Sequence, residues 1–252
     1  MTGITRLCFE RIEPYQLSES QYDLLDLSDI RSTYCLCDQK TLGLIGKRLR
    51  RRKHKGIALL GSGNYHYVTY LLLSELTCPF SLVLFDHHPD MLPAPSREVI
   101  SCGSWALEAI EKLPLLKKVI IIGVKKELTA AIPAKYRRKI SIFPEGWRWE
   151  DEKLLSVIPT SGVYLSIDKD VLSETDAVTD WDQGTMKLSQ LLALVRRTAA
   201  EKLMYGLDLC GEWPASDLRK KGAARMNAQA DHKVIALALS LWRKRRHFGA
   251  AS

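Results

Sequence analysis

The sequence predicts an α/β fold in which helices cover both faces of a mainly parallel sheet. Short apolar runs recur along the chain, stretches of helical length separate them, and most of the runs are apolar at consecutive positions, as in strands buried on both faces. The 252 residues are 46% hydrophobic and 26% charged, which excludes a disordered or collagen-like chain. We expect one three-layer α/β/α domain over residues 1–252.

The elements follow one another in regular alternation. The six expected strands are Ile57–Leu60, Ser81–Phe85, Lys118–Gly123, Lys139–Phe143, Gly162–Ile167 and Met204–Leu209. The expected helices cover residues 65–76, 105–113, 187–198 and 227–243. The first strand ends in Gly61-Ser62-Gly63, the third is rich in β-branched residues, and Pro144 ends the fourth. Residues 1–40 show no clear pattern.

Charge and cysteine content narrow the class of protein. The net charge of +8 is concentrated in residues 47–55 and 243–247, which contain no Phe, Tyr or Trp and no nucleic-acid-binding motif. We interpret both runs as solvated helix ends and expect no nucleic acid partner. The six cysteines form no C-x-x-C pair, and no apolar run approaches the ~18 residues of a membrane span. Without a visible secretory signal, the expectation is a cytoplasmic protein with reduced thiols.

Chemistry-bearing residues follow three of the strands directly. In parallel sheets, ligands bind beyond the carboxyl ends of the strands. The first strand leads to Asn64 and His66, the second to Asp86-His87-His88-Pro89-Asp90, and the fifth to Asp168-Lys169-Asp170. Alternation in an extended chain would place Asp86, His88 and Asp90 on one face and His87 on the other.

The four aspartates at one rim predict a metal site. Each carboxylate pair at ~4 Å costs roughly 4 kcal/mol at an effective dielectric constant of about 20, so the fold requires cations there. Two divalent ions would balance four aspartates. Oxygen-rich sites with one histidine for each ion suit Mn²⁺ better than Zn²⁺ or Mg²⁺.

These motifs resemble those of a known family. His66, the Asp86–Asp90 segment and Ser166-Ile167-Asp168-Lys169-Asp170 are similar, in that order, to the three metal signatures of the arginase/agmatinase/formiminoglutamase (ureohydrolase) superfamily. The resemblance implies an arginase-like α/β/α fold with a binuclear manganese centre and a hydroxide nucleophile between the two ions.

The resemblance also implies a role for each matching residue. One ion would be held by His66, Asp86, Asp90 and Asp168, and the other by Asp86, His88, Asp168 and Asp170. Asp90 would also orient the nucleophile, which makes it a candidate catalytic residue. Asn64, next to the first ligand, is a candidate substrate-binding residue.

Three features depart from the family pattern. Asp170 is not followed by the family's usual Asp-Pro pair. The loop at residues 101–104 lacks the histidine that relays a proton in the family. The glutamate that binds guanidinium in the family would be Glu212, which is one residue closer to Pro214 than expected. A bulge at Gly211 would let Glu212 serve as a catalytic and substrate-binding residue. The alternative is a surface glutamate.

The sequence therefore favours a manganese-dependent hydrolase of linear, non-peptide C–N bonds in a guanidino or amidino substrate. The expected substrate is a small cationic or amide-bearing molecule. One alternative is a deacetylase-like amidohydrolase that acts on acetylated amines with one zinc ion, although that class lacks the upstream histidine and the third aspartate. Another is a metal-binding protein of the same fold without catalysis.

Overall fold

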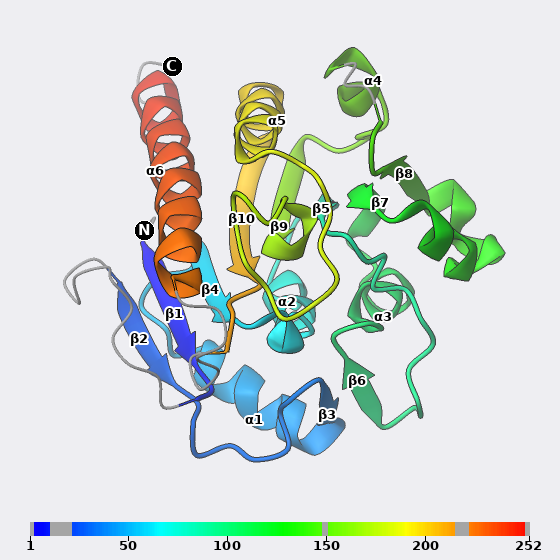
Figure 1. The fold of residues 1–252 in the computed structure, drawn as a ribbon, viewed down its shortest axis with the longest axis vertical. Helices are drawn as coiled ribbons and strands as arrows, with labels where there is room; N and C mark the ends of the chain where they lie inside the picture. The colour runs from blue at the N-terminus through cyan, green and yellow to red at the C-terminus, as the bar shows by residue number, and fades with distance from the viewer. Residues whose placement is uncertain (1–2, 11–21, 148–150, 215–221, 250–252) are drawn as a thin grey trace.

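The central element of the structure is a sheet of eight strands, each parallel to its neighbours (Figure 1). The computed structural model describes residues 3–10, 22–147, 151–214 and 222–249. The spatial order of the strands is β2 (Asp23–Asp26), β1 (Ile4–Cys8), β4 (Ile57–Gly61), β10 (Leu203–Cys210), β9 (Gly162–Asp168), β5 (Phe80–Phe85), β7 (Leu116–Val124) and β8 (Ile140–Pro144). The predicted fold class is confirmed.

All six expected strands are present. Five of them lie inside the sheet, where apolar runs are buried between two helical layers, and β8 is a partly exposed edge strand. Every residue of β5 and β9 is buried. The sequence did not reveal β1 and β2, nor the small antiparallel sheet of β3 (Leu36–Asp38) and β6 (Val99–Ser101). In the short edge strand β2, half-buried and exposed residues alternate, so it carries no apolar run.

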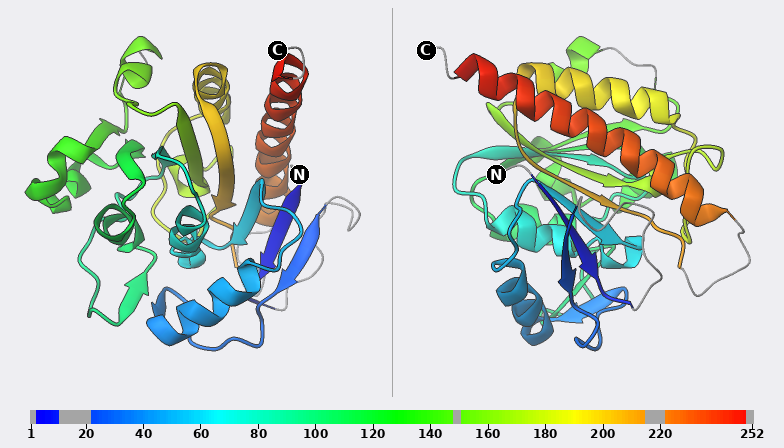
Figure 2. Two further views of the ribbon diagram at one scale, coloured as in Figure 1. Left: turned by 180° about the vertical axis from the view of Figure 1, so that it is seen from behind. Right: turned by 90° about the vertical axis from the view of Figure 1, so that its left-hand side faces the viewer.

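Helices cover the two faces of the sheet in separate groups (Figure 2). α1 (Gln39–Leu49), α2 (Val68–Ser74) and α3 (Trp105–Lys112) contribute to one hydrophobic core. α4 (Asp151–Ser156), α5 (Leu188–Glu201) and α6 (Ala223–Gly249) lie on the other side, where the second core includes Leu154, Leu191 and Val234. Among the described residues, none of the helices combines the length and hydrophobicity needed to cross a bilayer.

The expected helix over residues 65–76 is wrong at both ends. Ser62 accepts a hydrogen bond from the backbone N–H of Asn64 and caps a short 3-10 helix, Gly63–Tyr65. His66 ends that turn, and α2 spans only Val68–Ser74. This turn lies directly beyond the carboxyl end of β4.

The strand order determines where the site forms. β4, β10, β9 and β5 are adjacent in the middle of the sheet, although they are far apart in the chain (Figure 1). Their carboxyl ends therefore form one rim, and the loops that leave them converge there.

Candidate metal centre

Six side chains predicted as metal ligands meet at this rim, contributed by the segments after β4, β5 and β9. They are His66, Asp86, His88, Asp90, Asp168 and Asp170, and they form overlapping groups whose donor atoms lie within 4.8 Å of one another. The four aspartates are at most 6% exposed, and only His88 is partly accessible. Four buried carboxylates in one place are too costly for a fold unless cations or protons neutralise them.

The first group surrounds the Nδ1 atom of His66. This atom lies 3.3 Å from Asp86 Oδ2, 3.1 Å from Asp90 Oδ2 and 3.6 Å from Asp168 Oδ2. Ser166 donates its hydroxyl hydrogen to Asp208 and lies 2.8 Å from His66 Nε2, so its oxygen accepts from that nitrogen. The proton of the neutral imidazole is thereby held on Nε2, which leaves the Nδ1 lone pair facing the three carboxylates.

The second group is built around His88. Its Nδ1 atom lies 2.8 Å from Asp170 Oδ2 and 3.6 Å from Asp86 Oδ1. Asp86 thus faces both groups, one with each oxygen. Its Oδ2 atom is buried and makes no hydrogen bond.

A turn, rather than an extended chain, brings the D-x-H-x-D residues together. Asp86 accepts from the backbone N–H of His88 at 2.6 Å, and Asp170 accepts from that of His87 at 3.0 Å. Asp90 has a φ of 49°, in the left-handed region. The chain is therefore bent after β5 and not extended as expected, although Asp86, His88 and Asp90 line one cavity and His87 does not, which is the grouping that the alternation predicted.

Burial and mutual repulsion change the pKa values of these groups. Burial, together with the carboxylates of Asp170 and Asp86, raises the pKa of Asp168 to about 7. Burial and Asp86 raise the pKa of Asp170 to about 6. Burial alone would lower the pKa of His88, but hydrogen bonds to Asp170 and Asp86 raise it to about 11. The cluster thus attracts positive charge strongly.

Two further side chains hold the ligands in place and were not predicted. The Trp105 indole N–H donates to Asp90 Oδ2 at 2.5 Å, and its ring lies 4.7 Å from that of His66. Cys210, the last residue of β10, donates its thiol to Asp168 Oδ2 at 3.1 Å. Cys210 satisfies the same strand-end criterion that identified the aspartates, so this signal was present in the sequence.

The two residues predicted to bind substrate lie beside the ligands. The side-chain amide of buried Asn64 is fully engaged: it donates to Ser62 and Asp180 and accepts from Cys35. Glu212 forms an ion pair with Lys169, whose ammonium also lies 2.8 Å from Asp231 Oδ1. Lys169 is 2% exposed although it lies between two aspartate ligands in the chain. Its side chain leaves the cluster and reaches α6.

A cavity of about 190 Å³ opens over the ligands. Apart from the ligands, the described side chains that line it carry no formal charge. They include Pro89, Leu92, Cys102, Leu128, Ala131 and Trp181. Trp181 lies edge-on to His88 with ring centroids 5.6 Å apart. His87 does not line the cavity and lies near Asp182, 3.8 Å from its carboxylate.

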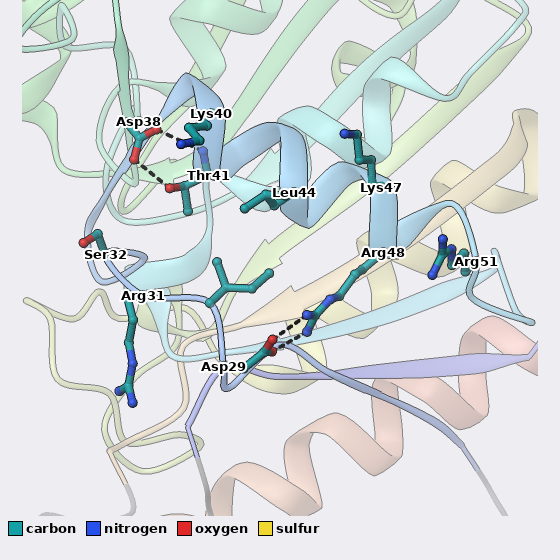
Figure 3. A pocket seen from close by; sticks show the side chains of 11 residues that line it. Asp29, Arg31, Ser32, Asp38, Lys40, Thr41, Leu44, Lys47, Arg48 and Arg51 are labelled. Atoms are coloured by element: carbon teal, nitrogen blue, oxygen red, sulfur yellow. Dashed lines mark hydrogen bonds and ion pairs between the residues drawn. The ribbon is translucent and has the colours of Figure 1, made fainter.

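The first basic run borders a separate groove of about 610 Å³ (Figure 3). In this groove Arg48 pairs with Asp29, and Asp38 caps α1 by accepting from Thr41. Arg52 is buried and pairs with Glu75 at 2.7 Å. Part of this run therefore serves internal ion pairs. The side chains of the second run, residues 243–247, lie outside the described part of the chain.

Known structures share this fold over nearly the whole chain. An X-ray structure of a hypothetical agmatinase from Burkholderia thailandensis is 20% identical, with a TM-score of 0.68 over 98% of this chain and 86% of the other. Formimidoylglutamase from Bacillus subtilis is 16% identical, with a TM-score of 0.67 over 95% and 87%. Arginase from Bacillus caldovelox is 16% identical, with a TM-score of 0.61 over 93% and 98%.

Sequence comparison gives the same relationship. An uncharacterized protein from Thermotoga maritima is 35% identical over 159 residues, which are 63% of this chain and 59% of that protein. The sequence pattern of the Arginase family matches residues 5–236. With its parallel sheet and its rim of histidine and aspartate, the chain belongs to the Arginase family.

Proposed function

We propose that the protein is a metal-dependent hydrolase that cleaves a linear, non-peptide C–N bond at a centre of two divalent ions. The observation that carries the proposal is the buried cluster of four aspartates and two histidines, with Asp86 facing both groups. The proposed substrate carries a guanidino or amidino group, as in the relatives named agmatinase, formimidoylglutamase and arginase.

The donor set fits two such ions. Four carboxylates balance the charge of two divalent cations, and the buried Oδ2 atom of Asp86 makes no hydrogen bond. One histidine in each group and an excess of oxygen donors favour Mn²⁺ for the pair. His66, Asp86, Asp90 and Asp168 would hold one ion, and Asp86, His88, Asp168 and Asp170 the other.

Two bound ions would supply Lewis acidity and a water of lowered pKa. The protein side chains would orient the nucleophile, position the ligands and exclude water. Asp90, fixed by Trp105, would orient the nucleophile by accepting its hydrogen bond. Ser166 and Asp208 keep the lone pair of His66 Nδ1 available to bind a metal ion. Trp181 and Leu92 would shield the reacting bond from bulk water at the cavity wall.

The cavity wall favours a second candidate, hydrolysis of an uncharged amide such as an acetylated amine. Beyond the ligands, the described lining offers apolar groups and no carboxylate for a guanidinium. Glu212, the carboxylate proposed for that role, is paired with Lys169. The two candidates differ in the charge of the reacting group and are separated by the substrates that the protein accepts.

The first test is metal-dependent stability. Ions that bind only the native state stabilise it by about 2.7 kcal/mol at a hundredfold excess over Kd. We expect Mn²⁺ to raise the melting temperature of the wild type with concentration, and to do so much less in His66→Ala. Metal content after gentle purification and a screen of guanidino, amidino and acetylated amines complete the test. Unfolding that does not respond to Mn²⁺, Co²⁺ or Zn²⁺ would contradict the proposal.

A further inference from the structure

The thiol of Cys210 faces the metal cluster from the end of β10. Its Sγ atom lies 3.1 Å from Asp168 Oδ2. The sulfur, a ring nitrogen of His66 and a carboxylate oxygen of Asp168 all lie within 4.8 Å of one another. Cys210 is fully buried, and the two partners are at most 4% exposed. The arrangement joins three metal-ligating side chains in one buried place.

The backbone explains why this cysteine reaches the cluster. In the parallel ladder of β10 and β9, Cys210 pairs with Asp168, so both side chains leave the sheet at the same level. The pairing of β10 with β4 shifts register between Leu209 and Cys210. Gly211, with a φ of 87°, then turns the chain away. The thiol is therefore fixed by the sheet and not by a loop.

A second observation points independently to a cation at this place. Asp86 Oδ2 is buried, accepts no hydrogen bond and lies 3.3 Å from Nδ1 of the same histidine. A buried carboxylate oxygen in this state is costly unless a cation binds it. Cys210 thus lies beside a site that already requires positive charge.

We propose that Cys210 is a sulfur ligand of the ion held by His66 and Asp168. The proposal rests on the metal centre proposed above and changes the preferred metal at one of its two positions from Mn²⁺ to a softer ion. On binding, the S–H proton now shared with Asp168 Oδ2 leaves to solvent, and the sulfur coordinates as thiolate. Thiolate donors select ions such as Zn²⁺ and Co²⁺ over Mn²⁺. The position beside Cys210 therefore prefers the softer ions, while the group around His88 keeps its oxygen-rich character.

Cobalt substitution tests this directly, because Co²⁺ reports its ligands by absorption. The full-length protein is stripped of metal and titrated with Co²⁺ alone, as wild type, Cys210→Ser and Cys102→Ser. Cys102 is the matched control, since it is another buried cysteine and lines the cavity over the ligands, but belongs to no ligand group among the described residues. We expect visible ligand-field bands in all three proteins. A near-ultraviolet sulfur-to-cobalt charge-transfer band should appear in the wild type and in Cys102→Ser and be absent in Cys210→Ser.

Affinity provides a second readout. Loss of an outer-shell partner alone weakens metal binding by about 10–100-fold, so we expect Cys210→Ser to weaken Zn²⁺ binding by at least about tenfold. Mn²⁺ binding should change much less, which shifts the ratio of the two dissociation constants.

The outcomes separate this inference from the proposed function. Ligand-field bands with no charge-transfer band, or with one that survives in Cys210→Ser, would overturn the sulfur ligand and leave the metal centre intact. The absence of any cobalt band would overturn the metal centre and the inference with it. If Cys210→Ser does not fold, X-ray absorption of the zinc-loaded wild type provides the test. A scatterer at the Zn–S distance of about 2.3 Å supports the proposal. A shell of only nitrogen and oxygen at about 2.0–2.2 Å overturns it.

Discussion

At the residue scale, the site combines groups that repel one another with groups that hold them in place. Asp168 is one of the groups under repulsion, since burial and two neighbouring carboxylates raise its pKa. Lys169, the next residue, points away from the cluster and forms attractive ion pairs with Glu212 and Asp231. Adjacent residues therefore have opposite effects on stability.

Replacing Asp168 with Asn should separate metal binding from folding. The amide keeps the side-chain volume and the oxygen that accepts from the Asp170 N–H, and it removes one of four buried charges. We expect the metal-free variant to melt at least about 2 °C higher than the metal-free wild type, which is close to 1 kcal/mol for a domain of this size. The rise in melting temperature with Mn²⁺ should be lost in Asp168→Asn. Asp182→Asn, at an exposed ion pair, is the control and should change neither value appreciably. Two bound metal equivalents in Asp168→Asn would contradict the shared-ligand role.

Replacing Lys169 with Met should destabilise the protein strongly. Removing one partner of a buried ion pair costs about 3–5 kcal/mol, because the charge that remains has lost its counter-ion in a desolvated place. Urea unfolding of Lys169→Met measures this cost. Lys125→Met breaks an exposed pair with Asp182 and should cost ~0–1 kcal/mol. An equal effect of the two substitutions would show that the pairing of Lys169 contributes little.

At the element scale, the carboxyl end of β10 sets the shape of the site. After Cys210 the chain passes through Gly211 at a φ of 87° and returns to β4, where Glu212 donates its N–H to the carbonyl of Gly61. A Cβ at position 211 would lie 2.4 Å from Asp168 Oδ1 and 2.8 Å from the Lys169 nitrogen. The expected bulge is not at this glycine: the register of β10 against β4 shifts one step earlier, between Leu209 and Cys210, and Glu212 then pairs with Lys169.

Gly211→Ala should therefore disturb the metal ligands as well as the backbone. Gly61 is the matched control, because it has the same φ of 87° and a Cβ there would meet nothing within 4 Å. Gly61→Ala should cost only the left-handed strain of about 1–2 kcal/mol. Gly211→Ala should cost more and also lose Mn²⁺-dependent stabilisation, as measured by thermal unfolding with and without the ion. Retention of metal binding in Gly211→Ala would show that Asp168 can move without loss of the bound ion.

At the scale of the whole molecule, two layers of helices and a parallel sheet present one rim with a small apolar cavity. The described lining outside the ligands is uncharged, and Glu212 lies outside it. If the proposed function holds, we expect the protein to discriminate between substrates mainly by the reacting group and by apolar contact with Leu92, Leu128 and Trp181.

Glu212→Gln tests how substrate is recognised. If the pairing with Lys169 is the main role of Glu212, the variant should lose stability while kcat/KM on the best substrate of the screen changes less than about threefold. A carboxylate that binds guanidinium in the transition state would instead contribute on the order of 2–4 kcal/mol. A loss of that size on a guanidino substrate, with both metals retained, would place Glu212 at the substrate.

The sequence by itself determined the fold class, six of the eight strands of the main sheet and the six candidate ligands. Strands buried on both faces appear as apolar runs, and a residue that directly follows such a run lies at the carboxyl rim whatever the strand order. Local pattern therefore sufficed for Asp86 and Asp168, whereas His66 was assigned as a ligand through the resemblance of the combined motifs to the family. It failed for β2, whose half-exposed edge position leaves no apolar run.

Only the tertiary structure decided which strand ends are neighbours. β10 lies between β4 and β9, so Cys210 lies beside Asp168, 42 residues away in the chain. α6 packs where Lys169 can reach Asp231, 62 residues further along. These contacts depend on crossover connections, and the first also depends on the register of β10 against β9, which shifts between Met204 and Gly206. Neither feature leaves a periodic signal in the sequence. The candidate ligands could be predicted because the position of each depends on its own strand. The positions of Cys210 and Asp231 relative to them depend on how different strands and helices are arranged.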